Sequence, residues 1–279
     1  MSINDITVII ATFKSGEKIK KCLDSIDRRI KVIIIENSND LNIKNLEKEY
    51  SNIECILAGD NIGYGCANNL GLKKVNTKYA LILNPDATLH SSTIENFLKE
   101  SEKVGKFAII GPYIQEEKNK FDKNYLKNIL PLAANNVKGF AMFLNMSEFE
   151  NIGFFDENFF FYFEEIDLCK RLIDKGKKIY LVPSIKIDHG GGASHNKSIN
   201  DEMELSRNWH WMWSTFNYHK KYKGFLISFF IVLPKLSSAI VKVLVYFLIS
   251  SNKKKIYYQR LSGLINAILG KSSWYRPKV

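Results

Sequence analysis

Three acidic side chains stand directly after a run of five aromatic residues in the second half of the chain. Glu164, Glu165 and Asp167 follow the segment FFFYF at residues 159–163. Apolar surroundings raise the pKa of a carboxyl group because they disfavour its charged form, and such a group can act as a general base. The same acids would also suit the first turn of a helix, where the macrodipole favours negative charge. The pattern indicates an acid–base site, with a plain helix start as the alternative.

Short, apolar, β-branched runs recur through the first hundred residues, with helical patterns between several of them. They are residues 6–11, 32–35, 53–57 and 79–83. This alternation predicts an α/β fold with a mostly parallel sheet flanked by helices. Ligands bind such sheets beyond the carboxyl ends of the strands. The candidate binding residues are those that end the strands: Thr12 and Phe13, Glu36 and Asn37, residues 59–65, and residues 84–86.

A glycine-containing segment, AGDNIGYGCANNLGL, follows the third predicted strand. Gly63 and Gly65 supply the GxG of a dinucleotide-binding fingerprint, but Asn68 stands where that fingerprint needs a small residue. The backbone amides of the segment could still face a phosphate. An ordinary loop followed by a helix start explains it equally well.

Asn84, Pro85 and Asp86 end the fourth predicted strand. A single carboxylate at this place can hold Mg²⁺ or Mn²⁺ while a nucleotide diphosphate completes the coordination shell, because hard cations favour oxygen ligands. Taken alone, the same three residues favour a turn. The prediction of a metal site here therefore depends on further motifs elsewhere in the chain.

Five segments, taken in order, resemble the bacterial family 2 glycosyltransferases and, among them, the rhamnosyltransferases. They are VIIATFKS at residues 8–15, VIIIENSND at 32–40, NIGYGCANNLGL at 61–72, LILNPDATL at 81–89 and GFFDENFFFYFEEIDLCKRL at 153–172. The resemblance covers about residues 5 to 200, and GLINAILGKSSWYRP at 263–277 is similar to the C-terminus of that subgroup. It implies a Rossmann-like GT-A fold, a nucleoside-diphosphate sugar donor, Mg²⁺ or Mn²⁺, and inversion at the anomeric carbon.

The resemblance also implies which residues bind the donor. Those expected at the nucleoside, ribose or diphosphate are Thr12, Phe13, Glu36, Asn61, Gly63 and Asn68. Asp86 falls where a variant of the DxD motif places its metal-binding carboxylate, and His189 of IDHGGGAS is expected to bind the metal or the diphosphate. Ser194 and His195 are expected to contact phosphate when that loop closes. A lone histidine is more often structural. Glu36 stands where the family often has Asp, so the choice between thymine and uracil stays open.

The catalytic and acceptor residues follow from the same resemblance. Glu165 is the expected base, although the family usually has Asp there, with Glu164 hydrogen-bonding the acceptor and Asp167 orienting the helix. Gly139, Phe140 and Tyr162 are expected near the acceptor. For Gly139 and Phe140 the alternative is an apolar buried strand, because VKGFAMFL alternates as core residues do.

The charge of the chain separates its last quarter from the rest. Residues 205–279 contain thirteen Lys or Arg and no Asp or Glu, against 27 basic and 29 acidic residues before them. These charges alternate with apolar runs at 225–233 and 236–249, which Pro234, Lys235 and Lys242 interrupt. The combination favours an interfacial helical hairpin on an anionic membrane over a spanning helix, and argues against nucleic acid.

The tail has a second interpretation. Its helices could pack on the body or form a homodimer, and Trp209, Trp211 and Trp213 could attach the tail or form an aromatic belt.

We divide the chain into a nucleotide-sugar-binding and catalytic domain at residues 1–200 and a helical region at 201–279. No secretory signal is recognised, and Cys22, Cys55, Cys66 and Cys169 lack metal or disulfide spacing, which indicates reduced thiols in the cytoplasm.

The sequence thus predicts a metal-dependent, inverting hexosyltransferase, peripherally attached to the cytoplasmic side of the inner membrane. The preferred donor is dTDP-rhamnose, and the acceptor is a hydroxyl of a glycan or of a polyprenyl-diphosphate-linked sugar. The alternatives are a UDP-sugar-dependent transferase, a nucleotidyltransferase and a noncatalytic, membrane-associated protein that binds nucleotide sugars.

Overall fold

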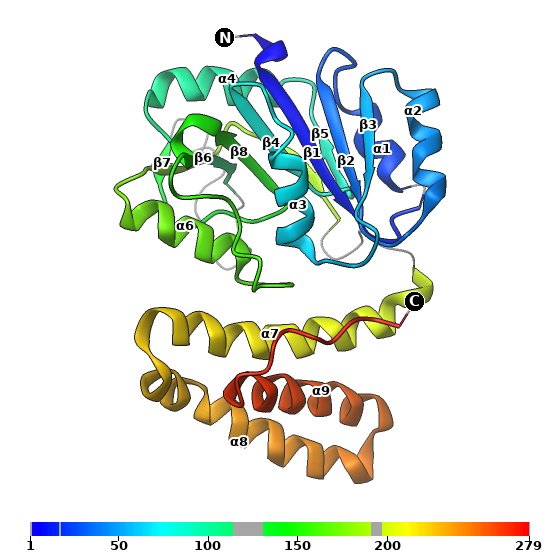
Figure 1. The fold of residues 1–279 in the computed structure, drawn as a ribbon, viewed down its shortest axis with the longest axis vertical. Helices are drawn as coiled ribbons and strands as arrows, with labels where there is room; N and C mark the ends of the chain where they lie inside the picture. Colours follow the sequence, from blue (N-terminus) through cyan, green and yellow to red (C-terminus); the bar gives the residue numbers. More distant parts are fainter. Residues whose placement is uncertain (1, 17, 114–130, 191–196, 279) are drawn as a thin grey trace. The chain divides into compact units, whose positions relative to one another are not determined.

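The computed structural model describes residues 2–16, 18–113, 131–190 and 197–278. The chain forms two compact units, of which the first comprises Met1–Phe155 with Glu165–Asn196 and the second comprises Asp156–Glu164 with Lys197–Val279. Figure 1 follows the chain from the N-terminal strands to the C-terminal helices. The sequence-based division places Asp156–Glu164 in the first region, whereas in the structure this segment is part of the second unit.

An eight-stranded sheet forms the centre of the first unit (Figure 1). Its strands are β1 (Ile6–Thr12), β2 (Lys31–Glu36), β3 (Ile53–Leu57), β4 (Tyr79–Leu83), β6 (Ile109–Pro112), β7 (Leu132–Ala133), β8 (Ala141–Asn145) and β9 (Ile179–Val182). They lie in the order β3-β2-β1-β4-β8-β6-β9-β7. Strands β1 to β4 are parallel, whereas β8 runs antiparallel to both β4 and β6. The predicted, mostly parallel α/β sheet is confirmed.

Helices cover both faces of this sheet, which explains why its central strands are continuous apolar runs. Val8, Ile9 and Ile10 of β1 are all fully buried. On one face lie α1 (Lys18–Asp24), α2 (Leu46–Glu49) and α4 (Thr93–Val104), and on the other α3 (Tyr64–Leu72) and α6 (Glu164–Asp174). The side chains from β1 that point to the two faces alternate along the strand.

Two structural features bring further residues to the carboxyl edge of the sheet. Because β8 is antiparallel to β4, its first residue, Ala141, pairs with Leu83 at the end of β4. Beyond that pair the amide of Asn84 donates to the carbonyl oxygen of Phe140 at 2.9 Å. Just after this point in the chain, β5 (Ala87–Leu89) pairs with the antiparallel β10 (Ile187–His189) in a small second sheet.

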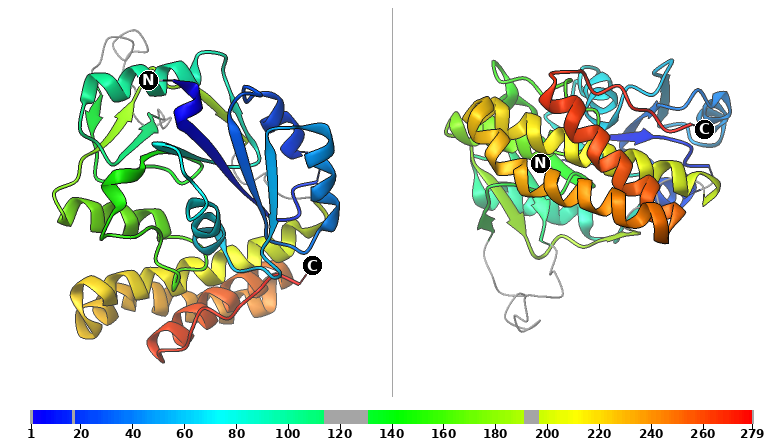
Figure 2. Two further views of the ribbon diagram at one scale, coloured as in Figure 1. Left: turned by 45° about the horizontal axis from the view of Figure 1, so that its top comes forward. Right: turned by 90° about the horizontal axis from the view of Figure 1, so that it is seen from below.

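The second unit is a group of three long helices. These are α7 (Asn200–Lys223), α8 (Phe225–Ile249) and α9 (Ser251–Ile268), which lie side by side (Figure 2). Their shared core contains Phe159, Trp209, Met212, Trp213, Phe216, Val232, Leu264 and Ala267. The burial of Trp209 and Trp213 supports a packing role for them, whereas Trp211 is 39% exposed. The two apolar runs at 225–233 and 236–249 belong to one helix, because α8 continues through Pro234.

Gly263 is the point of close approach between α9 and α7. A Cβ atom here would collide with the backbone carbonyl of Trp209, which cannot move aside as a flexible side chain can. We expect Gly263→Ala to lower the free energy of unfolding of the second unit by about 1–3 kcal/mol. Ile265→Ala, on an exposed side of the same helix, is the control and should change it little.

Tryptophan fluorescence during urea unfolding measures this effect directly. All four tryptophans, at positions 209, 211, 213 and 274, belong to the second unit, so their emission reports on that unit. An unchanged unfolding midpoint for Gly263→Ala would contradict the close helix contact.

Candidate functional site

The residues that end β1 and β2 lie side by side at the carboxyl edge of the sheet. Thr12 and Glu36 are partners in the strand register. Thr12 is 2% exposed, and its hydroxyl donates to the carbonyl oxygen of Ile35 at 3.2 Å. The backbone amide of the following residue, Phe13, donates to the hydroxyl of Ser15 at 3.3 Å. The Thr12 hydroxyl is therefore used in a hydrogen bond within the sheet. The side chain of Phe13, which is half-buried, is more accessible than that of Thr12.

Glu36 organises the loop that follows β2. Its carboxylate is 1% exposed and accepts hydrogen bonds from the amides of Ser38, at 2.9 and 3.0 Å, and Asp40, at 2.9 Å. The Ser38 hydroxyl donates to it as well. These bonds supply the partners that a buried carboxylate requires. Glu36 thus shapes the loop next to the predicted nucleoside pocket, and direct contact with a base stays a prediction.

Asn37 connects this loop to the glycine-containing segment. Its Nδ2 donates to Asn61 Oδ1 at 3.2 Å and to the carbonyl oxygen of Gly63 at 3.4 Å, and its Oδ1 accepts from the amide of Ile62 at 2.9 Å. Gly63 has a φ of 88°, which favours glycine, and it immediately precedes α3. The segment is therefore a fixed loop and helix start, as one of the two interpretations of the sequence predicts.

The polar and small residues of α3 do not occupy the positions that the dinucleotide-binding fingerprint requires. Asn68 is fully buried, and its Nδ2 donates to the carbonyl oxygen of Tyr64 at 2.9 Å. The close contact with the sheet is made instead by Gly71, where an added Cβ would lie 2.6 Å from Ile9. Asn68 thus bonds within its own helix, and its contact with the donor stays a prediction.

Asp86 and His189 form a polar pair beside the end of β4. His189 Nε2 lies 3.4 Å from Asp86 Oδ1 and 3.4 Å from Asn84 Nδ2. The imidazole also stacks on Phe140, with 4.4 Å between the ring centroids. The Asp86 side chain is only 5% exposed. Burial and then the charge of Asp86 raise the pKa of the nearby Cys22 thiol to about 12, so this thiol stays neutral.

The setting of His189 differs from the flexible, glycine-rich loop expected from the sequence. His189 belongs to β10 and pairs with Ala87 of β5, one residue after Asp86. This pairing explains how two residues about a hundred positions apart meet. The short β10 has no periodic pattern that would predict it, and Ser194 and His195 lie outside the described residues.

This corner of the site suits a divalent cation. Asp86 and His189 would supply a carboxylate oxygen and an imidazole nitrogen, and the buried Oδ1 of Asn84 has no hydrogen-bond partner in the described part of the chain. A buried acceptor without a partner is uncommon and is consistent with a ligand at this place. Within the described residues no three His, Cys, Asp or Glu side chains form a complete metal site. The remaining ligands would have to come from a diphosphate and water.

Glu165 lies in the first turn of α6, next to the residues that precede β8. A Cβ atom added to Gly139 would lie 3.9 Å from the Cβ of Glu165 and 3.7 Å from the ring of Tyr64. The Tyr64 hydroxyl donates to the carbonyl oxygen of Gly139 at 2.5 Å, which fixes this backbone. Burial raises the pKa of the Glu165 carboxyl, and backbone hydrogen bonds and the charge of Lys138 only partly oppose it. Such a carboxylate is a stronger base than an exposed one.

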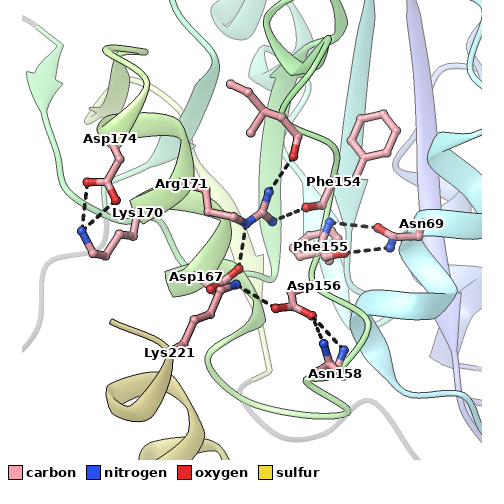
Figure 3. A network of polar contacts seen from close by, with 11 residues as sticks. Asn69, Phe154, Phe155, Asp156, Asn158, Asp167, Lys170, Arg171, Asp174 and Lys221 are labelled. Carbon is pink, nitrogen blue, oxygen red and sulfur yellow. Dashed lines mark hydrogen bonds and ion pairs between the residues drawn. The ribbon is translucent and has the colours of Figure 1, made fainter. Parts of the chain in front are cut away.

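The helix that carries Glu165 is fixed by a buried ion pair. Asp167 is fully buried and accepts a hydrogen bond from Arg171 Nε at 2.8 Å. The same guanidinium donates to the carbonyl oxygens of Ile152, at 3.0 Å, and Phe154 (Figure 3). Asp167 thus holds the Arg171 side chain that joins α6 to the loop at residues 152–154.

A second contact holds the same loop from α3. Asn69 exchanges two hydrogen bonds of 3.0 Å with the backbone of Phe155 (Figure 3). The ring of Phe155 also meets Tyr64 edge-on, at 6.2 Å between the centroids. Asn69, Tyr64 and Arg171 were not recognised from the sequence. Their polar side chains lie in helices that pack on the sheet, and the requirement that buried polar groups have partners could have marked them as contact residues.

The segment just before α6 is conformationally unusual. Tyr162 and Phe163 have φ values of 67° and 71°, which bulky residues rarely adopt and which occur most often at functional sites. Within the second unit the ring of Tyr162 meets Trp211 edge-on, at 5.3 Å. Glu164 is 5% exposed. The acceptor contacts expected of Tyr162 and Glu164 stay predictions.

The comparison with known families decides the classification. The model of Glycosyl transferase family 2 matches residues 7–169, more than half of the chain. The protein belongs to glycosyl transferase family 2. The matched range contains the ends of β1, β2 and β4 and both Asp86 and Glu165, so the predicted resemblance is confirmed.

Two relatives of the chain are named as a hexosyltransferase and a rhamnosyltransferase. The low-salt glycan biosynthesis hexosyltransferase Agl10 of Haloferax volcanii is 28% identical over 191 residues, which cover 61% of this chain and 62% of Agl10, less than two thirds of its length. Rhamnosyltransferase WbbL of Escherichia coli K12 is 27% identical over 251 residues, covering 76% of this chain and 91% of WbbL.

Among solved structures, the mannosyltransferase PcManGT from Pyrobaculum calidifontis, in complex with GDP-Man and Mn²⁺, is similar in fold. Its TM-score is 0.62 at 11% identity, with 96% of this chain and 88% of that chain covered. At this identity the likeness shows the fold alone. The predicted GT-A fold is confirmed.

Substitutions of Arg171 and Lys170, two neighbouring cations of α6, allow a buried ion pair to be compared with an exposed one. Arg171→Ala would leave the Asp167 carboxylate buried without its cation, and we expect it to destabilise the first unit by about 3–5 kcal/mol. Lys170→Ala is the matched control, because Lys170 pairs with Asp174 at the surface and should contribute less than about 0.5 kcal/mol. Urea unfolding followed by far-ultraviolet circular dichroism measures both. Equal effects of the two variants would refute the role of the Asp167–Arg171 pair.

Proposed function

We propose that this family 2 protein is an inverting glycosyltransferase that moves a sugar from a nucleoside diphosphate to an acceptor hydroxyl. The observation that carries the proposal is the position of two consecutive residues, Gly139 and Phe140. Gly139 adjoins Glu165, and Phe140 stacks on His189, which lies 3.4 Å from Asp86. One short segment thus connects the candidate base with the candidate metal ligands at the carboxyl edge of the sheet.

In this reaction Glu165 acts as the general base. Its carboxylate takes the proton of the acceptor hydroxyl while the hydroxyl oxygen forms a bond to the anomeric carbon, which requires an approach of about 2.6–3.2 Å. The bond from that carbon to the diphosphate oxygen breaks on the opposite face, and its electron pair leaves with the nucleoside diphosphate. A single displacement inverts the anomeric carbon, and the proton passes from Glu165 to solvent afterwards.

Asp86 and His189 would hold the divalent cation, Mg²⁺ or Mn²⁺, with the buried Asn84 oxygen beside them. When bound, such a cation offsets the negative charge that develops on the departing diphosphate. The protein contributes the orientation of these ligands. Phe140 stacks on the imidazole, and the pairing of β10 with β5 sets its distance from Asp86. The presence of Mn²⁺ with GDP-Man in PcManGT, which is similar in fold, supports this assignment.

The preferred donor is dTDP-rhamnose, and the preferred acceptor is a lipid-linked or polysaccharide hydroxyl at the cytoplasmic face of the inner membrane. The name of WbbL, a rhamnosyltransferase, supports this sugar. A UDP-sugar is the alternative, because Glu36 stands where the family often has Asp, and its carboxylate accepts hydrogen bonds from the amides of its own loop.

A panel of nucleoside-diphosphate sugars, each with Mn²⁺ or Mg²⁺, tests the activity through release of the nucleoside diphosphate. We expect Glu165→Gln to lower kcat by at least about a hundredfold while donor binding persists, because only the base is lost. Asp86→Asn should weaken donor binding that depends on the cation. Glu157→Gln, at an exposed position earlier in the sequence, is the control and should be active.

The same panel separates the alternatives. Turnover of a UDP-sugar alone would replace the preferred donor. Release of pyrophosphate from a nucleoside triphosphate and a sugar phosphate would indicate a nucleotidyltransferase instead. Donor binding without turnover, unaffected by Glu165→Gln, would indicate a noncatalytic binding protein.

The pH dependence of kcat has a defined direction. A base acts only when deprotonated, and burial raises the pKa of Glu165 above the ordinary value of 4.5. Activity should therefore fall as the pH is lowered through a pKa above 4.5, while donor binding measured separately stays constant across that limb. An acid limb at or below the ordinary glutamate value would argue against Glu165 as the base.

A further inference from the structure

One side of α8 is a largely apolar surface that no described residue covers. This outer face comprises Ile227, Phe230 and Leu233, then Val241, Leu244 and Leu248, which follow one another at three or four residues within each group and are between 38% and 87% exposed. The exposed Ser237 lies between the two groups. A helix of 25 residues is about 37 Å long. Contiguous apolar surfaces of this extent are unusual on soluble proteins and mark sites of interaction.

The opposite side of α8 faces the other helices of the second unit. Val232 and Ala239 are buried, and Val232 belongs to the core shared with α7 and α9. Lys235 lines a cavity of about 240 Å³ together with Tyr257 and Arg260 of α9. Lys242 Nζ lies 4.9 Å from the centre of the Tyr257 ring. Both lysines of α8 therefore point toward α9, and the outer face carries no charge.

Cations flank both ends of the outer face. Lys220 and Lys223 end α7 just before α8, and three more lysines, at positions 253–255, begin α9 just after it. Lys221 pairs instead with Asp156 at 2.7 Å. Lys254 Nζ lies 4.8 Å from the centre of the exposed Phe247 ring. Lys254, Lys255 and Lys278 also line a groove of about 530 Å³ that contains Phe247 and, as its one acid, Glu202. From residue 205 onward the chain has no acidic residue.

We propose that the outer face of α8 binds an anionic membrane surface, with the helix lying in the plane of the interface. Apolar side chains would enter the boundary between headgroups and acyl chains, and the lysines at both ends would meet anionic headgroups. A second copy of the chain is a poorer partner, because a symmetric contact would bring the same lysines together. The inference rests on the second unit alone and does not depend on the proposed transferase activity.

By length and composition α8 could also cross a membrane. Crossing would remove Val232 from its core with α7 and α9 and would place Lys235 and Lys242 in hydrocarbon. It would also remove α8 from the polar α9, which carries Lys253, Lys254, Lys255 and Arg260, and leave α9 packed on α7 alone. An in-plane position keeps all these contacts, since only the exposed side meets lipid.

Co-sedimentation of the full chain with preformed vesicles tests the proposal. We expect binding to vesicles of phosphatidylcholine with phosphatidylglycerol, weaker binding to phosphatidylcholine alone, and further weakening by salt. Leu244→Glu combined with Leu248→Glu should lower the affinity at least about tenfold, since two leucines that would enter the membrane are lost. Leu41→Glu is the matched control, because Leu41 is 69% exposed in the first unit. Unchanged tryptophan emission would show that the second unit of the variant remains folded.

The charge is tested separately. Lys253→Gln, Lys254→Gln and Lys255→Gln together should remove most of the preference for phosphatidylglycerol, whereas Lys74→Gln, Lys99→Gln and Lys106→Gln, all exposed in the first unit, should not. Release of the bound protein by alkaline carbonate is expected for an in-plane helix. Resistance to carbonate would overturn the in-plane position in favour of a span. A dimer that Leu248→Glu dissociates, together with no vesicle binding, would overturn the membrane as partner.

Discussion

The antiparallel direction of β8 beside β4 is the constraint on which the site depends. If β8 were parallel, the residues before it would lie at the opposite edge of the sheet. In the observed register Ala141 pairs with Leu83, and Asn84 is hydrogen-bonded to Phe140. Gly139 and Phe140 are thereby placed beyond the carboxyl end of β4, where parallel sheets bind ligands. Glu165 and His189 each meet one residue of this pair.

Positioning of the candidate base relies on polar groups that are buried and satisfied. The Asp167–Arg171 pair and Asn69 hold the loop at residues 152–155 from two helices, and this loop precedes α6. Removing one partner of such a pair costs far more than an exposed ion pair contributes, so the arrangement resists local rearrangement. Tyr162 and Phe163, with positive φ values, lie directly before α6. Rigid support of this kind is what a base needs to meet a substrate hydroxyl in a fixed geometry.

The strands and the general location of the site could be predicted from the sequence, because both depend on local pattern. Apolar β-branched runs identify β1 to β4, and the residues that end them are the candidates. The setting of His189 could not be predicted, since β10 has only three residues and its pairing with β5 spans about a hundred positions. The same holds for the contacts of Tyr64, Asn69 and Arg171, which are set by tertiary structure. The joining of both apolar runs into one helix through Pro234 is also set by tertiary structure, because a helix packed against neighbours can tolerate a proline that would break an isolated one.

The most direct measurement of the central claim is the configuration of the sugar first released when water replaces the acceptor. Proton NMR of the reaction with the donor that turns over, recorded before the free sugar equilibrates, distinguishes the two anomers. A single displacement assisted by Glu165 predicts the inverted anomer, and it predicts that Glu165→Gln abolishes its formation. Retention of the donor configuration would contradict the account, because it requires a second displacement that the proposed site does not provide.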